Sequence, residues 1–252
     1  MLRQRYLDLH LYNNMGRAFE FRKARKMKRW SNMSKTFTRI GREIIIAVKE
    51  SGPDPSSNSR LRAIIQNAKA VNMPKDNIER AIKKASEKSS ENFKEVLLEG
   101  YAPHGIAILV EAATDNNNRT VANIRSYFNK CDGSLATSGS VDFLFDHLCF
   151  FQINDHSIDI EKLELDLIDF GVIELSKLEN EISITARFED FGSIQKELER
   201  RGLEISSSEL EREAKINKTL TEDERLKVER LINMIDEDED VQNVYHDMKT
   251  ID

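Results

Sequence analysis

The spacing of apolar residues changes at about residue 93, and this change constrains the fold more than any other feature of the sequence. Upstream of it, apolar residues recur every three or four positions, as in the series Phe37, Ile40, Ile44 and Val48. That spacing puts apolar side chains on one face of a helix. Downstream, the runs 96–101 and 105–110 have the length and apolar content of strands. We therefore expect N-terminal helices followed by sheet-containing domains.

Three helices are expected before residue 93. The first covers 19–51, and a segment rich in Pro, Gly and Ser at 52–58 separates it from the second. The second carries an apolar series that starts at Leu61, and it stops at 72–74. Pro74 suits the first turn of the third helix, where its missing N–H costs nothing. Three helices with short connections predict a small bundle.

The middle of the chain is expected to form an α/β unit. A polar turn at 115–118 caps a predicted helix over 119–130, and Gly133 is expected to end that helix in the left-handed conformation. Alternating and continuous apolar runs predict two further strands, at 141–145 and 149–153.

The following segment repeats this kind of pattern. Between 154 and 214 the predicted order is helix, strand, strand, helix, strand, which is typical of a ferredoxin-like sandwich. A last helix over 223–235 and a strand over 241–245 are expected to complete the α/β unit that begins at residue 93. The segment 154–214 would then be an insertion.

The predicted fold class is α+β with three domains: an N-terminal helical bundle followed by two small α/β (ferredoxin-like) sandwiches, the last inserted in the middle one. Residues 1–15 are expected to be a disordered extension, with Met15 as the natural start and a short docked helix as the alternative. The helical domain covers 16–92, including a linker at its end. A discontinuous domain combines 93–153 with 215–252, and the inserted domain covers 154–214.

Charge is divided along the chain as sharply as periodicity. Residues 1–90 contain 21 Lys and Arg against 8 Asp and Glu, a net charge of +13, whereas the remainder carries −19 within an overall −6. A basic domain of this kind is the electrostatic footprint of a polyanion-binding surface. The acidic remainder would be repelled by the same polyanion, so we expect the contact to be made end-on.

The candidate nucleic-acid-binding residues are the cations of this domain. A first group of six falls within eight positions, and like charges four apart on a helix repel one another unless anions lie between them. The remaining seven are spread over the three predicted helices. A solvated basic face without a partner is the alternative reading. The full set is Arg22, Lys23, Arg25, Lys26, Lys28, Arg29, Lys35, Arg39, Arg42, Arg60, Arg62, Lys83 and Lys84.

Several blocks of the sequence resemble the YebC/PmpR family of transcriptional regulators. They are 37–44, 58–62, 72–84, 99–105, 114–120, 133–141 and 240–246. The resemblance implies a three-domain cytoplasmic protein with a helical N-terminal domain and two α/β domains. It also implies promoter DNA binding or, for some members and a mitochondrial relative, a role in translation on the ribosome. The sequence departs from the common Gly-His-Ser-Lys-Trp opening of the family, because residues 16–21 read Gly-Arg-Ala-Phe-Glu-Phe.

The sequence gives little indication of a catalytic site. The five histidines are scattered without the spacing of metal ligands or of a nucleophile and its base. The polar cluster 115–119 is either a catalytic loop or a helix-capping turn, and the capping turn requires fewer assumptions. The acidic run 236–240 is expected to be a solvated turn, since it lacks calcium-loop spacing. No cofactor, metal or small-molecule substrate is expected.

Two further expectations concern the compartment. Cys131 and Cys149 provide neither a disulfide framework nor metal-ligand spacing, so two reduced buried thiols in a cytoplasmic protein are expected. No apolar stretch approaches the roughly 18 residues that a membrane span requires.

The sequence therefore predicts a non-enzymatic regulator that binds nucleic acid. Duplex DNA is the family-level expectation, and ribosomal RNA in a factor that relieves translational stalling is the alternative. Charge cannot choose between them, because phosphate contacts position a protein without specifying sequence. The acidic α/β domains are expected to face away from the nucleic acid and to offer a surface to the ribosome or to a basic protein.

Overall fold

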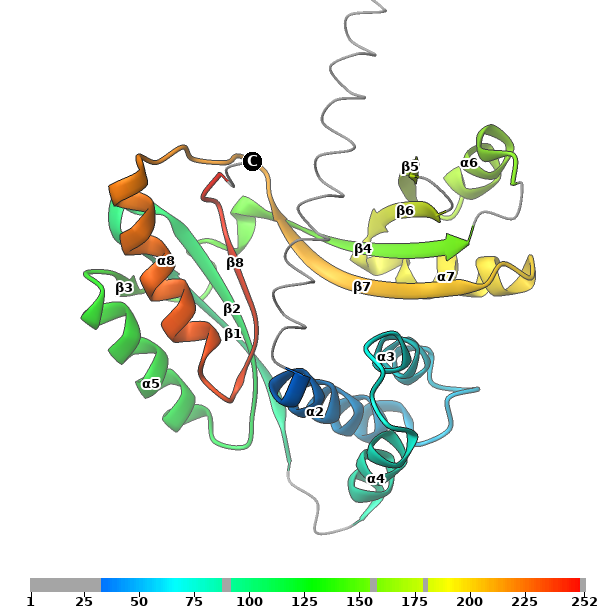
Figure 1. Ribbon diagram of the computed structural model, residues 1–252, viewed down its shortest axis with the longest axis horizontal. Coiled ribbons are helices and arrows are strands. Elements are labelled where there is room, and N and C mark those ends of the chain that lie inside the picture. The colour runs from blue at the N-terminus through cyan, green and yellow to red at the C-terminus, as the bar shows by residue number, and fades with distance from the viewer. Residues whose placement is uncertain (1–32, 88–91, 155–157, 179–180, 250–252) are drawn as a thin grey trace, which may run out of the picture.

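The structure is a computed structural model, and it describes residues 33–87, 92–154, 158–178 and 181–249 (Figure 1). Its N-terminal part consists of three helices: α2 (Met33–Ser51), α3 (Ser59–Ala70) and α4 (Lys75–Ser86). Ile44, Leu61 and Ala68 are fully buried between them. The predicted apolar faces are confirmed over the described residues.

A single side chain connects the first two helices. The Asn58 carboxamide oxygen accepts a hydrogen bond from the Leu61 N–H at 2.9 Å and so caps α3. Its Nδ2 donates to the Ala47 carbonyl at 2.8 Å and to the Gly52 carbonyl at 2.9 Å. Asn58 is buried, and it satisfies the orphan backbone groups at the end of one helix and the start of the next.

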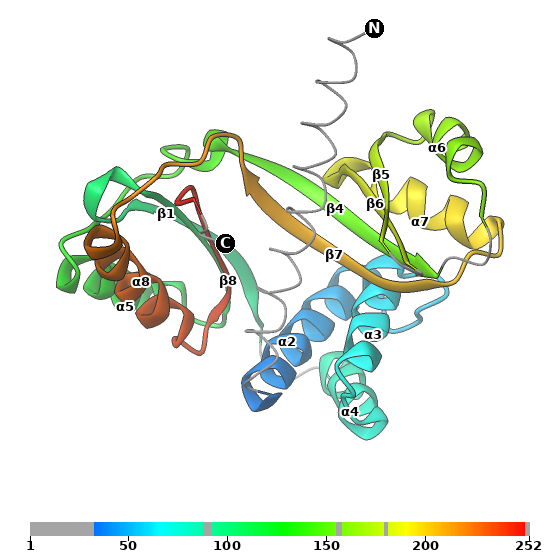
Figure 2. The same cartoon turned by 45° about the horizontal axis from the view of Figure 1, so that its top comes forward.

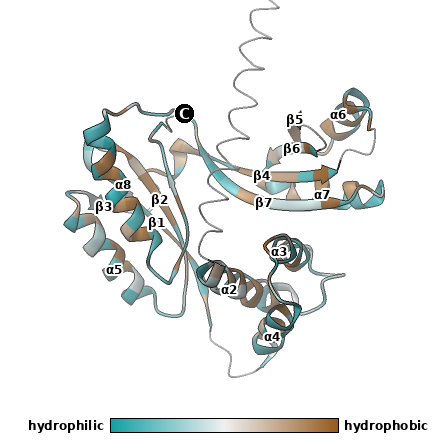
Figure 3. Ribbon diagram, in the orientation of Figure 1, coloured by the Kyte–Doolittle hydropathy of each residue, from teal (hydrophilic) through white to brown (hydrophobic). Residues whose placement is uncertain are grey.

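The first antiparallel sheet has the strand order β3-β1-β2-β8. Its strands are β1 (Lys94–Tyr101), β2 (Ala107–Thr114), β3 (Ser134–Leu135) and β8 (Val241–His246). Helices α5 (Asn117–Lys130) and α8 (Glu222–Asp236) cover one face of it (Figure 1). Figure 3 shows β1 and β2 as largely hydrophobic, whereas both helices alternate between hydrophobic and hydrophilic stretches, as expected for helices with one buried side.

The second antiparallel sheet has the order β5-β6-β4-β7. Its elements follow one another as strand, helix, strand, strand, helix, strand. The last five are the elements predicted for 154–214, and β4 precedes them. The core contains the fully buried Phe151, Leu167 and Leu198. The elements are β4 (Phe145–Asn154), α6 (Ile160–Ile168), β5 (Val172–Leu178), β6 (Glu181–Arg187), α7 (Phe191–Arg200) and β7 (Ile205–Ala214).

Strand β4 corrects one part of the sequence prediction. The expected strands 141–145 and 149–153 are not separate: Asp142–Leu144 is a 3₁₀ turn and β4 is one continuous strand. Within β4, Cys149 lies opposite Ala186 of β6 and Leu210 of β7. The strand that was assigned to the middle domain thus belongs to the second sheet, which starts nine residues before the expected division at 154. Apolar runs indicate a strand but do not identify its partners.

The end of α5 also differs from expectation. The residue in the left-handed conformation is Asp132, with φ 55°, and not Gly133. Gly133 is needed there for another reason, because a Cβ at this position would lie 2.8 Å from the Tyr101 carbonyl oxygen. The glycine allows close approach of α5 to β1, and the turn itself is made by an aspartate, a residue type that tolerates this conformation.

The helical part contacts both sheets. Helix α3 lies along β7, where Asn67 Nδ2 donates to the Ser208 carbonyl at 2.5 Å and Asn67 Oδ1 accepts from the Ser208 N–H at 3.2 Å (Figure 2). Helix α2 lies against the turn between α8 and β8, through ion pairs described below. Helix α4 packs mainly on α2 and lies at the outer edge of the molecule in both views (Figures 1 and 2).

Candidate functional site

Thirteen cations are predicted to bind nucleic acid, and they fall into three groups in the structure. The first six, from Arg22 to Arg29, lie outside the described residues. Five others make intramolecular ion pairs. The last two, Lys83 and Lys84, are exposed on α4.

The predicted cations of α2 are bound by acidic residues of the same chain. Arg39 Nη2 donates to the Asp236 carboxylate and to the Asp236 carbonyl, both at 2.9 Å, and it is buried. Lys35 Nζ also bonds the Asp236 carbonyl. Arg42 Nη1 lies 3.2 Å from the Asp240 carboxylate and donates to the Ala113 carbonyl at the same distance. These three side chains therefore hold α2 to the turn that precedes β8.

That turn is not solvated as expected. Asp238 and Asp240 are buried, with 8% and 3% of their surface exposed. Asp240 accepts hydrogen bonds from Thr120 Oγ1 at 2.7 Å and from Arg119 Nη2 at 2.9 Å, and Asp238 accepts one from the Tyr127 hydroxyl at 3.0 Å. The expectation holds for Glu237 and Glu239, which are exposed, and it was wrong for Asp238 and Asp240. The groups that bury these two carboxylates come from distant parts of the chain.

Electrostatics follow from this arrangement. Burial raises the pKa of Asp236, but the Arg39 and Lys35 charges outweigh it and hold that pKa below its usual value. Asp240 shows the same balance, with Arg119 and Thr120 as the opposing donors. Both carboxylates are thus ionised at neutral pH and available to the α2 cations.

The two predicted arginines of α3 are also engaged. Arg60 pairs with Glu50 at 2.9 Å and with Glu95 of β1. Arg62 pairs with Glu199 of α7 at 2.8 Å and donates to the Pro55 carbonyl at 2.6 Å. Arg60 links the helical part to strand β1 and Arg62 links it to helix α7, so both arginines join parts of the molecule.

Four exposed cations lie on α4. Lys83 and Lys84 share its outer side with Lys75 and Arg80, which the sequence analysis did not select. We call these four residues the α4 outer face. The spacings of three and four residues from Arg80 to Lys83 and Lys84 on an amphipathic helix were the available signal. Asp76 and Glu79 are also exposed there, and Glu79 pairs with Lys75 at 3.3 Å.

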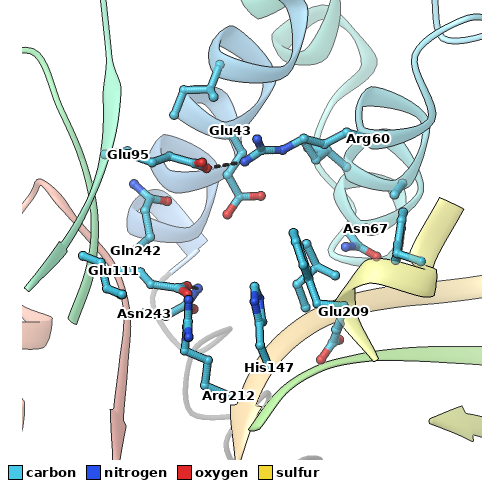
Figure 4. Close-up of a pocket in the computed structure, with 18 of the residues that line it drawn as sticks. Glu43, Arg60, Asn67, Glu95, Glu111, His147, Glu209, Arg212, Gln242 and Asn243 are labelled. Atoms are coloured by element: carbon cyan, nitrogen blue, oxygen red, sulfur yellow. Dashed lines mark hydrogen bonds and ion pairs between the residues drawn. The ribbon is translucent and has the colours of Figure 1, made fainter. Parts of the chain in front are cut away.

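A cavity lies where the helical part and the two sheets meet, with a volume of about 480 Å³ (Figure 4). Its walls come from α2, α3, β1, β2, β8, β4 and β7, so chain segments far apart in sequence build it. His147 stacks on Phe188 at a ring separation of 3.9 Å on one side. Glu111 accepts from Arg212 at 2.9 Å and from Asn243 at 3.0 Å on another. No local pattern in the sequence marks this cavity.

Burial and the nearby Arg212 lower the pKa of His147, so its imidazole is neutral at neutral pH. Among the described residues no cluster of His, Cys, Asp and Glu could hold a metal ion. Cys131 and Cys149 are free and buried, and burial raises the pKa of the Cys149 thiol to about 12. The thiol is therefore a poor nucleophile.

The family is shown by comparison with known proteins. Residues 17–88 match the family model described as the TACO1/YebC protein N-terminal domain, and residues 93–248 match the TACO1/YebC second and third domain. The chain belongs to the TACO1/YebC family. The resemblance seen in its sequence blocks is thereby confirmed.

Relatives of the TACO1/YebC family share most of the chain. A protein of Flavobacterium johnsoniae is 67% identical over 93% of this chain and 99% of its own length, and one of Porphyromonas gingivalis is 58% identical over 93% and 98%. Both are named probable transcriptional regulatory protein. The crystal structure of a conserved hypothetical protein from Aquifex aeolicus has a TM-score of 0.71 and 36% identity, covering 86% of this chain and 90% of that one.

Within the described ranges, no helix is long and apolar enough to cross a membrane.

Proposed function

We propose that this protein regulates transcription by binding duplex DNA through the α4 outer face, together with the basic residues at 22–29, and that it acts by binding rather than by catalysis. The observation that carries the proposal is the placement of four exposed cations on α4, whereas the five predicted cations of α2 and α3 make ion pairs with acidic residues of the same chain. The names of the relatives support a regulatory role.

The local geometry supports a duplex as the ligand. Helix α3 ends at Ala70 and α4 begins at Lys75, so four residues connect them, and Asn72 among them has a φ of 57°. A connection of three or four residues is typical of helix-turn-helix units, in which the second helix enters the major groove. Helix α4 has twelve residues and so extends for about 18 Å, and a helix about 10–12 Å across fits a major groove about 12 Å wide.

The ion pairs of α2 make this helix a poorer surface for phosphate binding than α4. A phosphate that approached α2 would compete with Asp236 and Asp240 for the same arginines, at a turn whose negative charge repels it. Among the described elements, α4 packs mainly on α2, and it lies at the outer edge of the helical part (Figure 2). Contact through α4 therefore agrees with the end-on approach that the charge distribution predicts.

A competition assay tests the proposal. Labelled protein is offered intact ribosomes and a pool of genomic duplex fragments at about physiological salt. The double variant Arg80→Glu, Lys83→Glu is compared with Lys227→Glu, Arg230→Glu, which makes the same charge change on exposed positions of α8.

We expect the wild-type protein and the α8 variant to retain duplex fragments, with one sequence enriched, and the α4 variant to lose them. Equal loss in both variants would show that only net charge matters, which would refute the α4 surface. Ribosome binding that survives excess duplex would replace DNA with ribosomal RNA as the target.

A further inference from the structure

The central cavity contains two buried polar groups that have no partner among the described residues. Gln242 of β8 lines it with 7% of its surface exposed, and neither its Oε1 nor its Nε2 is hydrogen-bonded within that part of the chain. Ser208 of β7 also lines it and is 2% exposed, and its Oγ is unpartnered in the same sense. Most buried polar atoms in folded proteins are hydrogen-bonded, so such groups indicate a ligand or water in the cavity.

The charged groups of the lining are already engaged. Arg60 pairs with Glu95, and Arg212 pairs with Glu111, so each lining arginine is offset by a lining carboxylate. Four further polar side chains of the lining also have partners: Glu43, Glu209, Asn67 and Asn243. The hydrogen-bonding capacity that stays unused belongs to a carboxamide and a hydroxyl, which are uncharged groups that both donate and accept. The lining therefore favours an uncharged ligand with donors and acceptors of its own.

An aromatic wall favours a planar ligand. His147 of β4 stacks on Phe188 with ring centroids 3.9 Å apart and an angle of 11° between the planes, and both rings line the cavity. Phe188 is 39% exposed, so part of its ring stays uncovered. Nucleobases stack on aromatic side chains through their π faces. The volume of about 480 Å³ is within the range of known ligand pockets.

The Gln242 carboxamide selects among planar ligands. It presents an acceptor and a donor side by side, and the amino group and neighbouring ring nitrogen of adenine form the complementary pair. A glutamine bonds that edge of adenine through two hydrogen bonds. Uracil also has a complementary edge, but its single ring offers less area to the aromatic wall than the two rings of a purine.

We infer that the cavity binds an adenine base, with its amino edge on the Gln242 carboxamide and its rings against the wall formed by His147 and Phe188 (Figure 4). A free nucleoside and an unpaired base of a single strand present the same chemistry. The inference does not depend on duplex binding, because none of the α4 outer face lines the cavity.

The test uses the full-length protein labelled with ¹⁵N and follows the Gln242 side-chain amide signals. The probes are adenosine, uridine and two matched analogues of adenosine. One analogue is 7-deazaadenosine, which lacks the acceptor nitrogen, and the other is 6-dimethylaminopurine riboside, which lacks the amino hydrogens. Both keep the two rings for stacking. We expect adenosine to bind at least about tenfold more tightly than either analogue, since each loses one of two paired hydrogen bonds.

A single-stranded deoxyadenosine tetranucleotide identifies the source of the base. Tighter binding of adenosine than of the tetranucleotide would assign the cavity to a free nucleoside, and the reverse order would assign it to an unpaired base of a strand. Both orders support the inference, because the Gln242 signals report the cavity and not the α4 outer face.

Variants separate a site from a packing defect. Gln242→Leu removes an unsatisfied amide, so we expect it to fold with unchanged or higher stability and to lose adenosine binding, followed by calorimetry. Gln195→Leu is the matched control: Gln195 is fully buried with both amide atoms unpartnered, but it does not line the cavity, so binding should persist.

Three results would overturn the inference. Equal affinity for adenosine and both analogues, or binding that survives in Gln242→Leu, would remove the paired edge. Uridine binding as tight as that of adenosine would remove the assignment to a purine. No shift with any probe at about 5 mM, with Gln242→Leu simply more stable, would mean that water alone occupies the cavity. Loss of DNA binding in the α4 variant bears on none of these outcomes.

Discussion

At the scale of single residues, the buried carboxylate of Glu99 organises the loop between β3 and β4. It accepts hydrogen bonds from the backbone N–H groups of Gly139 and Val141, each at 2.6 Å, and from Asp142 at 3.0 Å. Burial raises its pKa, but these donors outweigh burial and hold the pKa below its usual value. A small polar loop thus obtains a fixed conformation from one side chain on a strand.

Replacing Glu99 with Gln should therefore destabilise the protein. The amide can accept one set of bonds, but its NH₂ group would face backbone donors, which leaves buried groups unsatisfied. We expect a loss of about 1–3 kcal/mol in the free energy of unfolding at pH 7, measured with urea.

The stability difference between the wild type and Glu99→Gln should also depend on pH. A carboxylate whose folded pKa is depressed contributes stability that is present above its unfolded pKa, near 4.3, and is lost as the pH falls through the folded pKa. The difference between wild type and Glu99→Gln should be constant from pH 7 to about 5 and shrink below about 4. A difference that is unchanged at pH 3 would assign the cost to packing instead of charge.

Two glycines differ in the space that their surroundings leave for a side chain. A Cβ on Gly100 would lie 2.6 Å from Phe128 Cζ and 2.7 Å from the Ser134 carbonyl oxygen, whereas one on Gly41 in α2 would meet nothing within 4 Å. Gly100→Ala should cost about 1–3 kcal/mol through overpacking. Gly41→Ala should instead stabilise by about 0.5–1 kcal/mol, because alanine favours a helix interior. Urea unfolding of both variants decides the matter, and a stable Gly100→Ala would show that β1 and α5 can separate.

At the scale of elements, the docking of α2 depends on ion pairs with the turn before β8. We expect Arg39→Ala to destabilise the protein by about 1–2 kcal/mol. This is the lower part of the range for hydrogen bonds to charged groups, because Asp236 is 45% exposed and water screens it.

A double-mutant cycle with Asp236→Ala measures the pair directly. If the two side chains act on each other, the double variant should lose less stability than the two single variants combined, and the coupling should weaken in 1 M NaCl. Additive losses would mean that the Asp236 carbonyl and packing hold α2.

The sequence predicted the buried faces of helices well, but it did not predict the partners of strands. The stripe that includes Ile44 and Val48 gave α2 its buried face, because a helix is determined by spacing within one segment. The partners of β4 lie at least 27 positions away, and Thr120, which bonds the buried Asp240, lies 120 positions away. No local pattern carries that information. The same limit applies to the cations: their number was visible in the sequence, but which of them meet an acidic partner was decided by the fold.

At the scale of the whole molecule, the two charge classes are less separate than their order in the chain suggests. Arg39, Arg42 and Arg62 of the basic helices form ion pairs with acidic residues of the two α/β parts. Part of the positive charge therefore holds the parts of the molecule together. The surface that we propose for a polyanion is therefore small: it is the α4 outer face, at the edge of the helical part. Binding should then depend on few phosphates for a protein with 38 basic residues.

Salt dependence measures how many phosphates that surface contacts. For duplex DNA, the slope of log K against log salt is about −0.9 per neutralised phosphate. If Arg80 and Lys83 each contact one phosphate, Arg80→Ala, Lys83→Ala should make the slope less steep by about 1.8, whereas removal of Lys227 and Arg230 from α8 should leave it unchanged. Fluorescence anisotropy from about 50 to 300 mM NaCl gives both slopes. An unchanged slope in the α4 variant, with weaker binding at every salt concentration, would mean that α4 positions other contacts and that the phosphates are bound elsewhere.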